Sequence, residues 1–294
     1  MRGYLFIKPR RSNRACCSTC SPSTVFQLDR RKCAALEASE PPSQLLPVRW
    51  KFDNDVLCRF LFLRDGLKPV YPESRLSHNW LIKKAVNDKL RPRLPELSGR
   101  VVDLGCGVRP FEQDILQYAD EYVGVDWGNT LHGLQADIIA DLNRPLPIAN
   151  EVASHVVSFE VLEHLAEPQV MLAEAFRILR RGGEVTLSVP FQWWVHEAPW
   201  DYYRYTRYGL EYLLRKAGFT NIEVTPTTGF WSMWLLKLNY QTVRLARGPR
   251  PVRMLVRALL LPFWWTNQHL AQAIDWFWPE ENETAGYFVT ASKP

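Results

Sequence analysis

From residue 100 onward, short β-rich runs alternate with segments of helical periodicity, and this alternation limits the folds open to the chain. Strands separated by helices of this length pair in parallel through crossover connections. The pattern predicts a doubly wound α/β sheet, whose ligands bind beyond the carboxyl ends of the strands. Seven runs are predicted as strands: VVDL (101–104), YVGVD (122–126), DIIAD (137–141), HVVSFE (155–160), EVTLSVP (184–190), FTNIEVT (219–225) and GYFVTASKP (286–294).

Two of the intervening helices carry clear end signals. One spans 168–181, starts with a proline suited to the first helical position, and is expected to end at Gly182 and Gly183. The other follows Thr206, a good N-cap, and ends at Gly218. Both helices fall between predicted strands, as crossover connections require.

The same patterns divide the chain into five segments. RLSHNWLIKKAVNDKL, before the first strand, has apolar residues at helical spacing and predicts a helical lead-in. A Trp-rich insertion separates the last two strands; polar residues interrupt its apolar runs below membrane-spanning length, so amphipathic helices are expected. The segments are a disordered or non-native leader (1–45), the lead-in (46–98), the core (99–225), the insertion (226–284) and the final strand (285–294).

The leader, residues 1–45, is rich in arginine and contains Cys16, Cys17, Cys20 and Cys33. It is open to interpretation as a transit peptide, a zinc-binding segment, a disordered extension, or a segment translated from a start codon placed too early. No histidine or second spaced cysteine pair completes a metal site, so a disordered or non-native segment is favoured. The other two cysteines of the chain are isolated, which indicates a reducing compartment.

The charge distribution disfavours nucleic acid as a partner. The chain has a formal charge of +5, but its first 32 residues hold eight basic side chains against Asp29 alone, which leaves about −2 for the remainder. A folded part without basic excess does not grip a phosphate backbone non-specifically. Because no export or membrane-spanning signal is found, a cytoplasmic location is predicted, with membrane association left open.

The stretch GRVVDLGCGVRPFE (99–112) carries the strongest functional signal. A strand ending in Asp103 leads into Gly105 and Gly107, which let the backbone approach a ligand where a Cβ would clash. Such a pair alone marks only a tight turn, but Asp126 ends the next strand about twenty residues later, where an acidic residue accepts hydrogen bonds from ribose hydroxyls. The third glycine of a pyrophosphate site is missing. The loop therefore predicts a nucleoside-containing cofactor without phosphates.

Successive motifs of the chain resemble those of class I S-adenosylmethionine-dependent methyltransferases of the type 11 kind: VVDLGCG, VGVDW, ADLNRPLPIA, SFEVLEHLAEP and LRRGGE. The resemblance implies a Rossmann-like sheet with an antiparallel seventh strand beside the sixth, and S-adenosylmethionine as the cofactor. The implied cofactor-binding residues are Asp103, Gly105, Cys106 and Gly107 around the amino-acid part, Asp126 at the ribose, Trp127, Asp141 and Leu142 at the adenine, and Glu160 under the sulfonium end.

The aromatic loop FQWWVHEAPWDYYRYT (191–206) follows the fifth predicted strand and is expected to line an acceptor pocket. Methylating a hydroxyl requires a base that removes its proton, and histidine is best tuned for this near neutral pH. His196 is the first candidate and His164 the second, with Asp201 as a third catalytic residue. A structural latch that ties the loop to the next helix is the alternative.

The EVLEH string offers a metal hypothesis. Glu160, Glu163 and His164 resemble the metal ligands of small-RNA 3′-terminal methyltransferases and of ubiquinone-pathway O-methyltransferases. A hard divalent ion there would bind and acidify a substrate hydroxyl. The same string is frequent in metal-free members of the class, so no metal is predicted.

Three functions compete for this chain. The aromatic loop resembles that of methyltransferases in bacterial polysaccharide and surface-glycan biosynthesis, so the expected reaction is O-methylation of a sugar or lipid-linked glycan. Methylation of a quinone or polyprenyl-type aromatic ring is the alternative, favoured by the apolar insertion. A non-catalytic interaction protein is the third, and the complete set of Asp103, Gly105, Gly107 and Asp126 argues against it.

The Trp-rich insertion also bears on partners, most densely over residues 230–278. Tryptophan at the edge of an apolar face favours a membrane interface, and arginine can contact acidic head groups, which predicts peripheral membrane contact. Packing on the sheet and formation of a homodimer are the alternatives for the same helices.

Overall fold

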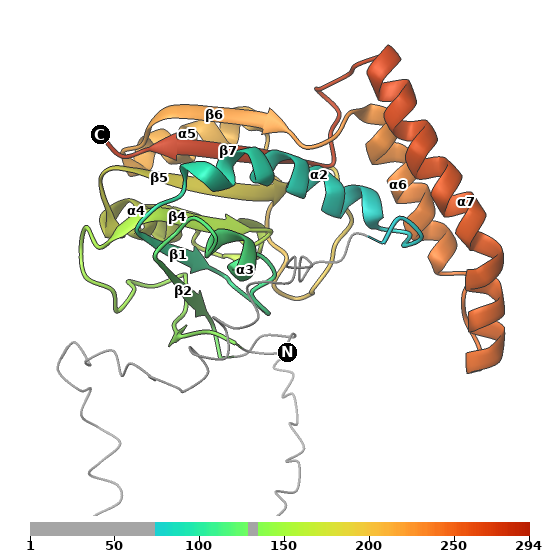
Figure 1. The fold of residues 1–294 in the computed structure, drawn as a ribbon, viewed down its shortest axis with the longest axis horizontal. Coiled ribbons are helices and arrows are strands. Elements are labelled where there is room, and N and C mark those ends of the chain that lie inside the picture. The colour runs from blue at the N-terminus through green and yellow to red at the C-terminus, as the bar shows by residue number, and fades with distance from the viewer. Residues whose placement is uncertain (1–73, 129–134) are drawn as a thin grey trace, which may run out of the picture. The chain divides into compact units, whose positions relative to one another are not determined.

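The computed structural model describes residues 74–128 and 135–294 (Figure 1). The predictions for the leader and its cysteines, and for residues 46–73 of the lead-in, lie outside the described residues. Within the described part, the predicted α/β core is formed.

Seven strands form one mixed sheet, as predicted. Its strands are β1 (Arg100–Leu104), β2 (Glu121–Asp126), β3 (Ile138–Ile139), β4 (Ala153–Phe159), β5 (Leu179–Pro190), β6 (Thr220–Pro226) and β7 (Gly286–Ser292). They lie in the order β3-β2-β1-β4-β5-β7-β6, and β7 is antiparallel to both of its neighbours. The order reverses direction between β1 and β4, so the switch point where ligands bind lies at the carboxyl ends of these two strands.

Helices cover both faces of the sheet (Figure 1). One apolar core joins α4 and α5 to the sheet, and a second joins α2, η1 and α3 to its other face. This division follows from the strand pattern, since successive side chains point to opposite faces. The helices are α2 (Trp80–Leu90), η1 (Arg91–Glu96), α3 (Glu112–Ile115), η2 (Leu162–His164), α4 (Pro168–Ile178), α5 (Arg207–Ala217), α6 (Phe230–Val243) and α7 (Arg250–Phe277).

The predicted end of α4 at Gly182 and Gly183 is wrong. The helix ends at Ile178, and Leu179 is already extended, with φ −66° and ψ 137°. Leu179 is fully buried and pairs with Ala153 of β4, so its burial in the sheet outweighs the helical propensity of the residues around it. The glycine pair instead lies within β5, where Gly182 has a φ of +74°.

Both predicted ends of α5 are confirmed. The Thr206 hydroxyl accepts a hydrogen bond from the Gly209 backbone N–H at 3.1 Å, as an N-cap does. Gly218 closes the helix in the left-handed region, with φ +105°, where a residue with a Cβ would be strained. Because α5 starts directly after the aromatic loop, this cap fixes where the loop ends.

The insertion between β6 and β7 forms a helical hairpin of α6 and α7, with α7 on the far side of α6 from the sheet (Figure 1). It is joined to α2 by an apolar cluster and by Gln268, whose amide oxygen accepts from the Leu81 N–H at 2.9 Å. Asp275 of α7 accepts the N–H groups of Trp231 and Ser232 in the first turn of α6. Among the described residues, no helix combines the length and apolarity needed to cross a membrane.

Candidate active site

The glycine loop after β1 is held against the end of β2. The N–H groups of Gly105 and Cys106 both donate to the carbonyl oxygen of Val125, at 2.8 and 3.1 Å. Gly105 has a φ of +84°, and a Cβ there would lie 2.3 Å from a methyl group of Val161, so only glycine fits. At Gly107 the φ is +52°, and a Cβ would meet nothing within 4 Å. The backbone at Gly107 therefore borders open space.

Asp126, the last residue of β2, is bound to that loop. Its carboxylate accepts the N–H of Gly107 at 2.7 Å through Oδ2 and the N–H of Trp127 at 2.7 Å through Oδ1. These two bonds fix the carboxylate beside the loop, since each orients one of its oxygens. A carboxylate oxygen has a second lone pair, so Asp126 retains capacity to accept from a ligand hydroxyl.

A cavity of about 340 Å³ lies beyond the carboxyl ends of β1, β2 and β4 and is named here the cofactor cavity. Its walls are apolar at Trp127 and Leu142 and acidic at Asp126, Asp141 and Glu160. Eight of the residues predicted to bind the cofactor line this one cavity: Gly105, Cys106, Gly107, Asp126, Trp127, Asp141, Leu142 and Glu160. A flat apolar ring and a pair of hydroxyls fit this combination, so the residues present suit an adenosine-containing cofactor.

Asp103 lines the neighbouring cavity. It is almost fully buried, and the Tyr122 hydroxyl donates to its Oδ2 at 2.5 Å. Burial raises the pKa of Asp103 to about 7, with a smaller contribution from the negative charge of Asp126, while the hydrogen bond from Tyr122 opposes the rise. The carboxyl group is therefore close to half-protonated near neutral pH.

A second cavity, of about 430 Å³, adjoins the first and is named here the acceptor cavity. The two share Gly105, Cys106, Pro110, Phe159, Glu160, His164 and Glu197 as lining residues. Aromatic rings form much of its remaining wall: Trp193 stacks on Trp194 with centroids 4.2 Å apart, and Tyr240 of α6 lies 4.2 Å from Trp194. The stacked rings give a planar molecule an apolar surface, and polar side chains add to the same wall: Lys83, Asn87, Asp103, Ser188 and Thr227.

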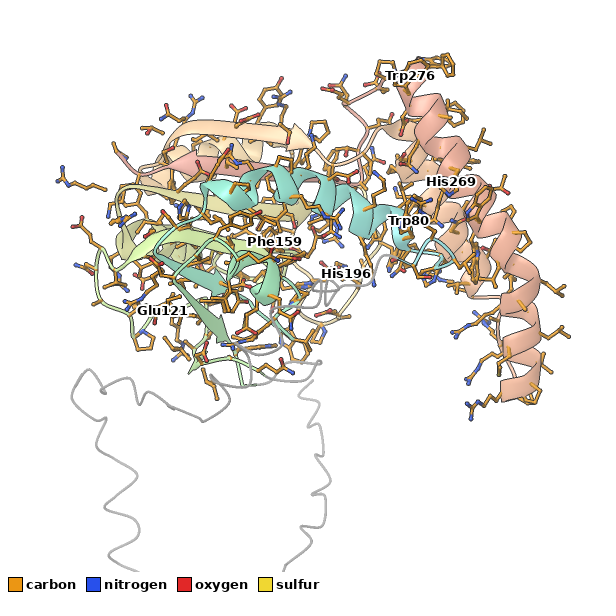
Figure 2. The ribbon with its side chains drawn as sticks, viewed as in Figure 1. Trp80, Glu121, Phe159, His196, His269 and Trp276 are labelled. Atoms are coloured by element: carbon orange, nitrogen blue, oxygen red, sulfur yellow. The ribbon has the colours of Figure 1, made fainter. Side chains whose placement is uncertain are left out.

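The aromatic loop, residues 191–206, is fastened over η2. The N–H of Tyr202 donates to the Glu163 carbonyl oxygen at 2.9 Å, and the Tyr205 hydroxyl donates to the Leu162 carbonyl oxygen at 2.9 Å. In Figure 2, His196 lies at the end of the sheet where β4 ends at Phe159, away from Glu121 at the start of β2. The loop thus covers the carboxyl ends of the strands, as predicted.

Asp201 orients His196. Its carboxylate accepts the His196 backbone N–H at 2.8 Å and lies 3.4 Å from His196 Nδ1. Arg204 donates to both carboxylate oxygens, at 2.6 and 2.7 Å. Burial would raise the pKa of Asp201, but these hydrogen bonds and the charge of Arg204 outweigh it and lower the pKa to about 2. Asp201 lines neither cavity, so its contacts give it a positioning role.

His164 and His196 converge on Glu163. Their Nε2 atoms lie 3.5 and 3.8 Å from Glu163 Oε1, and their rings are 4.8 Å apart. His164 Nδ1 donates to the Trp200 carbonyl oxygen at 2.7 Å, so its Nε2 carries the lone pair when the ring is neutral. Both carboxylate oxygens of Glu163 are buried and have no hydrogen-bond partner. Burial raises the pKa of Glu163 well above its usual value, and the charge of Glu160 adds to this.

The same three side chains could hold a cation. Glu163, His164 and His196 each offer a ligand atom, and these atoms lie within 4.8 Å of one another. The set differs from the metal hypothesis drawn from the sequence, because His196 takes the place of Glu160. Glu160 instead accepts a hydrogen bond from the Ser188 hydroxyl at 2.8 Å and lines both cavities.

Sequence reasoning missed several lining residues. Trp200 lines the cofactor cavity and meets Trp127 edge to face, with centroids 5.2 Å apart. Glu197 lines both cavities, and Tyr240 reaches the acceptor cavity from the insertion. The first two lie in the loop already singled out for its aromatic density. Nothing in the local sequence marks Tyr240, because only the packing of α6 brings it to the site.

The strand order with its antiparallel seventh strand, and a glycine loop bound to an acidic residue at the end of β2, define the fold of a class I methyltransferase. Residues 80–224 match the family model described as a methyltransferase domain. These residues form a methyltransferase domain, and the cofactor of this class is S-adenosylmethionine.

The chain is similar to ubiquinone biosynthesis O-methyltransferases. It is 26% identical to that of Pseudomonas aeruginosa over 160 residues, which cover 50% of this chain and 62% of the relative. It is also 26% identical to that of Cereibacter sphaeroides over 189 residues, which cover 53% of this chain and 76% of the relative. The matched part thus spans about three fifths of the Pseudomonas protein's own length.

Solved structures of methyltransferases are also similar to this chain. Phosphoethanolamine N-methyltransferase 2 of Haemonchus contortus, in complex with S-adenosyl-L-methionine, matches with a TM-score of 0.47 and 18% identity, covering 72% of this chain and 52% of that one. A SAM-dependent methyltransferase from Archaeoglobus fulgidus matches with a TM-score of 0.46 and 15% identity, covering 80% of this chain and 99% of that one.

Proposed function

We propose that this protein transfers a methyl group from S-adenosylmethionine to a hydroxyl oxygen on an aromatic, quinone-type ring. The observation that carries the proposal is the junction of the two cavities, where a site suited to adenosine opens beside one walled by Trp193, Trp194 and Tyr240. A planar ring stacked on these side chains would present its substituents to His164 and His196.

The relatives favour this acceptor over the one expected first. The curated relatives are named for ubiquinone biosynthesis, and none of those reported above is named for glycan biosynthesis. The wall of the acceptor cavity agrees with an aromatic ring. A sugar is bound mostly through its hydroxyls, which need several polar partners, whereas stacked indole rings offer an apolar surface. We therefore place quinone-type methylation before O-methylation of a glycan.

S-adenosylmethionine, when bound, supplies an electrophilic methyl group on a sulfonium. The protein's part in the reaction is to hold the acceptor oxygen in line with that group, which removes most of the entropic cost of the encounter. Trp193 and Trp194 would fix the plane of the ring, while Asp126 and Trp127 would fix the adenosine. With both substrates bound, the aromatic loop would help to exclude water from the junction of the cavities.

We assign the removal of the hydroxyl proton to His196. Its Nδ1 lies 3.3 Å from the Trp194 carbonyl oxygen, 3.4 Å from Asp201 and 3.4 Å from Arg204 Nη2. The two oxygen acceptors favour the tautomer with the proton on Nδ1, which would leave Nε2 to accept. A phenolic hydroxyl, with a pKa of about 10, is a far better proton donor to imidazole than a sugar hydroxyl is. The imidazolium that forms would be stabilised by the charge of Asp201.

A divalent cation is a second candidate for activating the hydroxyl, and the orphaned carboxylate of Glu163 between two imidazoles favours it. Glu163, His164 and His196 would hold the ion. A cation there would lower the pKa of a hydroxyl bound to it, which does the same chemical work as a base.

The test is a methyl-transfer assay with the full chain, S-adenosylmethionine labelled on its methyl group, and two acceptors. One is a prenylated catechol and the other a lipid-linked sugar. We expect label in the catechol product, identified by mass spectrometry as a methoxy group, and none in the sugar. Label in the sugar alone would restore the glycan assignment, and label in neither, with intact binding of S-adenosylhomocysteine, would overturn the aromatic acceptor.

A further inference from the structure

The charged side chains of the hairpin of α6 and α7 are almost all basic. No acidic residue occurs between Glu223 and Asp275. The carboxylate of Asp275 is already engaged, since it caps the first turn of α6. The basic residues in this interval are Lys237, Arg244, Arg247, Arg250, Arg253 and Arg257. The hairpin is therefore strongly cationic, although the chain beyond its first 32 residues has a slight excess of negative charge.

One side of α7 carries an apolar stripe whose side chains are exposed. Its members recur every three or four residues, or every seven, which places them on one face of a helix. Their exposed fractions run from 38% at Phe263 to 78% at Phe277. The stripe consists of Val252, Leu255, Leu259, Phe263, Leu270 and Phe277.

The other side of α7 holds it to the protein. Trp264, Gln268 and Ala271 are buried there, against α6 and α2. Figure 2 shows Trp80 of α2 beside the helix that carries His269, and their rings lie 5.0 Å apart. Since these contacts occupy one face, the apolar stripe points away from the methyltransferase domain.

The first turns of α7 extend beyond the end of α6 (Figure 1). Arg250, Arg253 and Arg257 lie in these turns at spacings of three and four residues, so they form a row on the face that Trp264, Gln268 and Ala271 continue, across the helix from the stripe. All three are exposed, as are Leu255 and Leu259 in the same turns. Packing within the domain explains neither the row nor the stripe.

We propose that this hairpin docks on the surface of a bilayer that contains anionic lipids. The stripe would lie at the boundary of head groups and acyl chains, and the arginine row would contact lipid phosphates. The 28-residue helix, about 42 Å long, would lie in the plane of the surface rather than across it. Exposed indoles at Trp265, Trp276 and Trp278 suit the same interface.

Charge distinguishes a lipid surface from a second copy of the chain. Two hairpins that met through this stripe would bring two cationic helices together, with no carboxylate between Glu223 and Asp275 on either copy to offset the charge, and like charges oppose such contact. An anionic surface supplies the missing negative charge. Tyr240 of α6 lines the acceptor cavity, so docking would also bring that cavity to the lipid, a consequence that rests on the proposed function.

The experiment is flotation of the full chain with phosphatidylcholine vesicles, with and without phosphatidylglycerol. We expect flotation only with phosphatidylglycerol, and less of it at high salt. Replacing Arg250, Arg253 and Arg257 by glutamine should weaken binding on the order of 100-fold, from the usual contribution of each basic residue near an anionic surface. The double variant L255Q/L259Q should also lose flotation, since it removes apolar contact without changing the charge.

The arginine-rich leader supplies a matched control. Replacing Arg10, Arg11 and Arg14 by glutamine removes the same charge, and flotation should persist. Loss of flotation in this variant alone would overturn the proposal by assigning binding to the leader. A second result would also overturn the proposal: the original protein does not float with vesicles but forms a dimer without lipid, measured by sedimentation equilibrium, and the L255Q/L259Q variant is a monomer. Circular dichroism checks that each variant is folded. None of these measurements depends on methyl transfer, so they test membrane docking separately from the proposed function.

Discussion

The Nε2 atom of His196 lies 3.8 Å from Oε1 of Glu163, a fully buried carboxyl group behind the acceptor cavity. Burial lowers the pKa of His196, and the neighbouring His164 lowers it further, so the ring is neutral before a proton arrives. Once protonated, the ring gains the attraction of the Asp201 carboxylate. The geometry therefore suits a side chain that accepts a proton during the reaction and is regenerated afterwards.

Replacing His196 by asparagine tests this role. We expect kcat for the catechol acceptor to fall about 10²-fold or more, the usual contribution of a positioned general base. Binding of S-adenosylhomocysteine should stay within about twofold of the original, since His196 does not line the cofactor cavity. Steady-state kinetics and calorimetric titration measure the two effects separately.

An unchanged kcat would remove His196 from the mechanism. A parallel variant, Asp201→Asn, keeps the imidazole but weakens the contacts that orient it. It should lower kcat less than His196→Asn does, and added imidazole should rescue only the variant that lacks the ring. Equal losses in both variants, with no rescue, would indicate a role in holding the loop rather than in moving a proton.

Metal removal separates the two ways of activating the hydroxyl. If His196 acts as a base, dialysis of the full chain against EDTA leaves kcat unchanged, and this is the expected result. The cation candidate has the opposite outcome: activity disappears with EDTA and returns with a divalent ion. In that case Glu163→Gln should weaken binding of the ion, measured directly by titration, because the amide removes a charged ligand.

The antiparallel seventh strand was expected only from the family resemblance, but the strand pattern was sufficient to predict the rest of the sheet, because most of the strand runs are short and rich in β-branched residues. It failed at Leu179, where helical propensity and a glycine pair suggested a longer helix. The deciding interaction is non-local, since Leu179 pairs with Ala153 and its carbonyl oxygen accepts from Lys293 near the end of the chain. No local pattern contains that information.

The cofactor cavity was predictable for a different reason. Gly105, Gly107 and Asp126 follow the ends of neighbouring strands, which the topology brings together. The remaining predicted residues were expected from the family resemblance: Cys106, Trp127, Asp141, Leu142 and Glu160. The acceptor cavity combines the aromatic loop with Tyr240 of α6 and with Ile82 and Val86 of α2. These elements are distant in the sequence and meet only through tertiary packing, so sequence reasoning found the loop without its partners.

Asp126→Ala should abolish most cofactor affinity. The carboxylate is predicted to accept ribose hydroxyls, and it also holds the N–H groups of Gly107 and Trp127. Hydrogen bonds to a charged group contribute about 1.5–3 kcal/mol each, so binding of S-adenosylhomocysteine should weaken on the order of 100-fold or more. Calorimetric titration measures this. Asp120→Ala, an exposed site just before β2, is the matched control and should bind normally.

Two tryptophans make it possible to test whether one cavity binds the cofactor and the other binds the acceptor. Trp194 lines only the acceptor cavity, and Trp200 lines only the cofactor cavity. Trp194→Ala should raise KM for the aromatic acceptor about tenfold and leave KM for S-adenosylmethionine unchanged, while Trp200→Ala should do the reverse. Both constants come from the same initial-rate experiment. If both variants raise the same constant, the assignment of the two cavities is wrong.

Asp103 predicts a pH dependence of stability in the ligand-free protein. Burial raises the pKa of its carboxyl group from 3.8 to about 7 in the folded state, so folding favours the protonated form. The stabilisation is fully present below the unfolded pKa and is lost as the pH rises through about 7, with a magnitude on the order of a few kcal/mol.

Asp103→Asn is the variant that tests this pH dependence, because its side chain cannot ionise and keeps an oxygen that accepts the Tyr122 hydroxyl. Urea unfolding at about pH 5 and about pH 8 should therefore show the original protein losing stability relative to this variant as the pH rises. A difference in unfolding free energy that stays constant with pH would mean that Asp103 titrates normally in the folded protein.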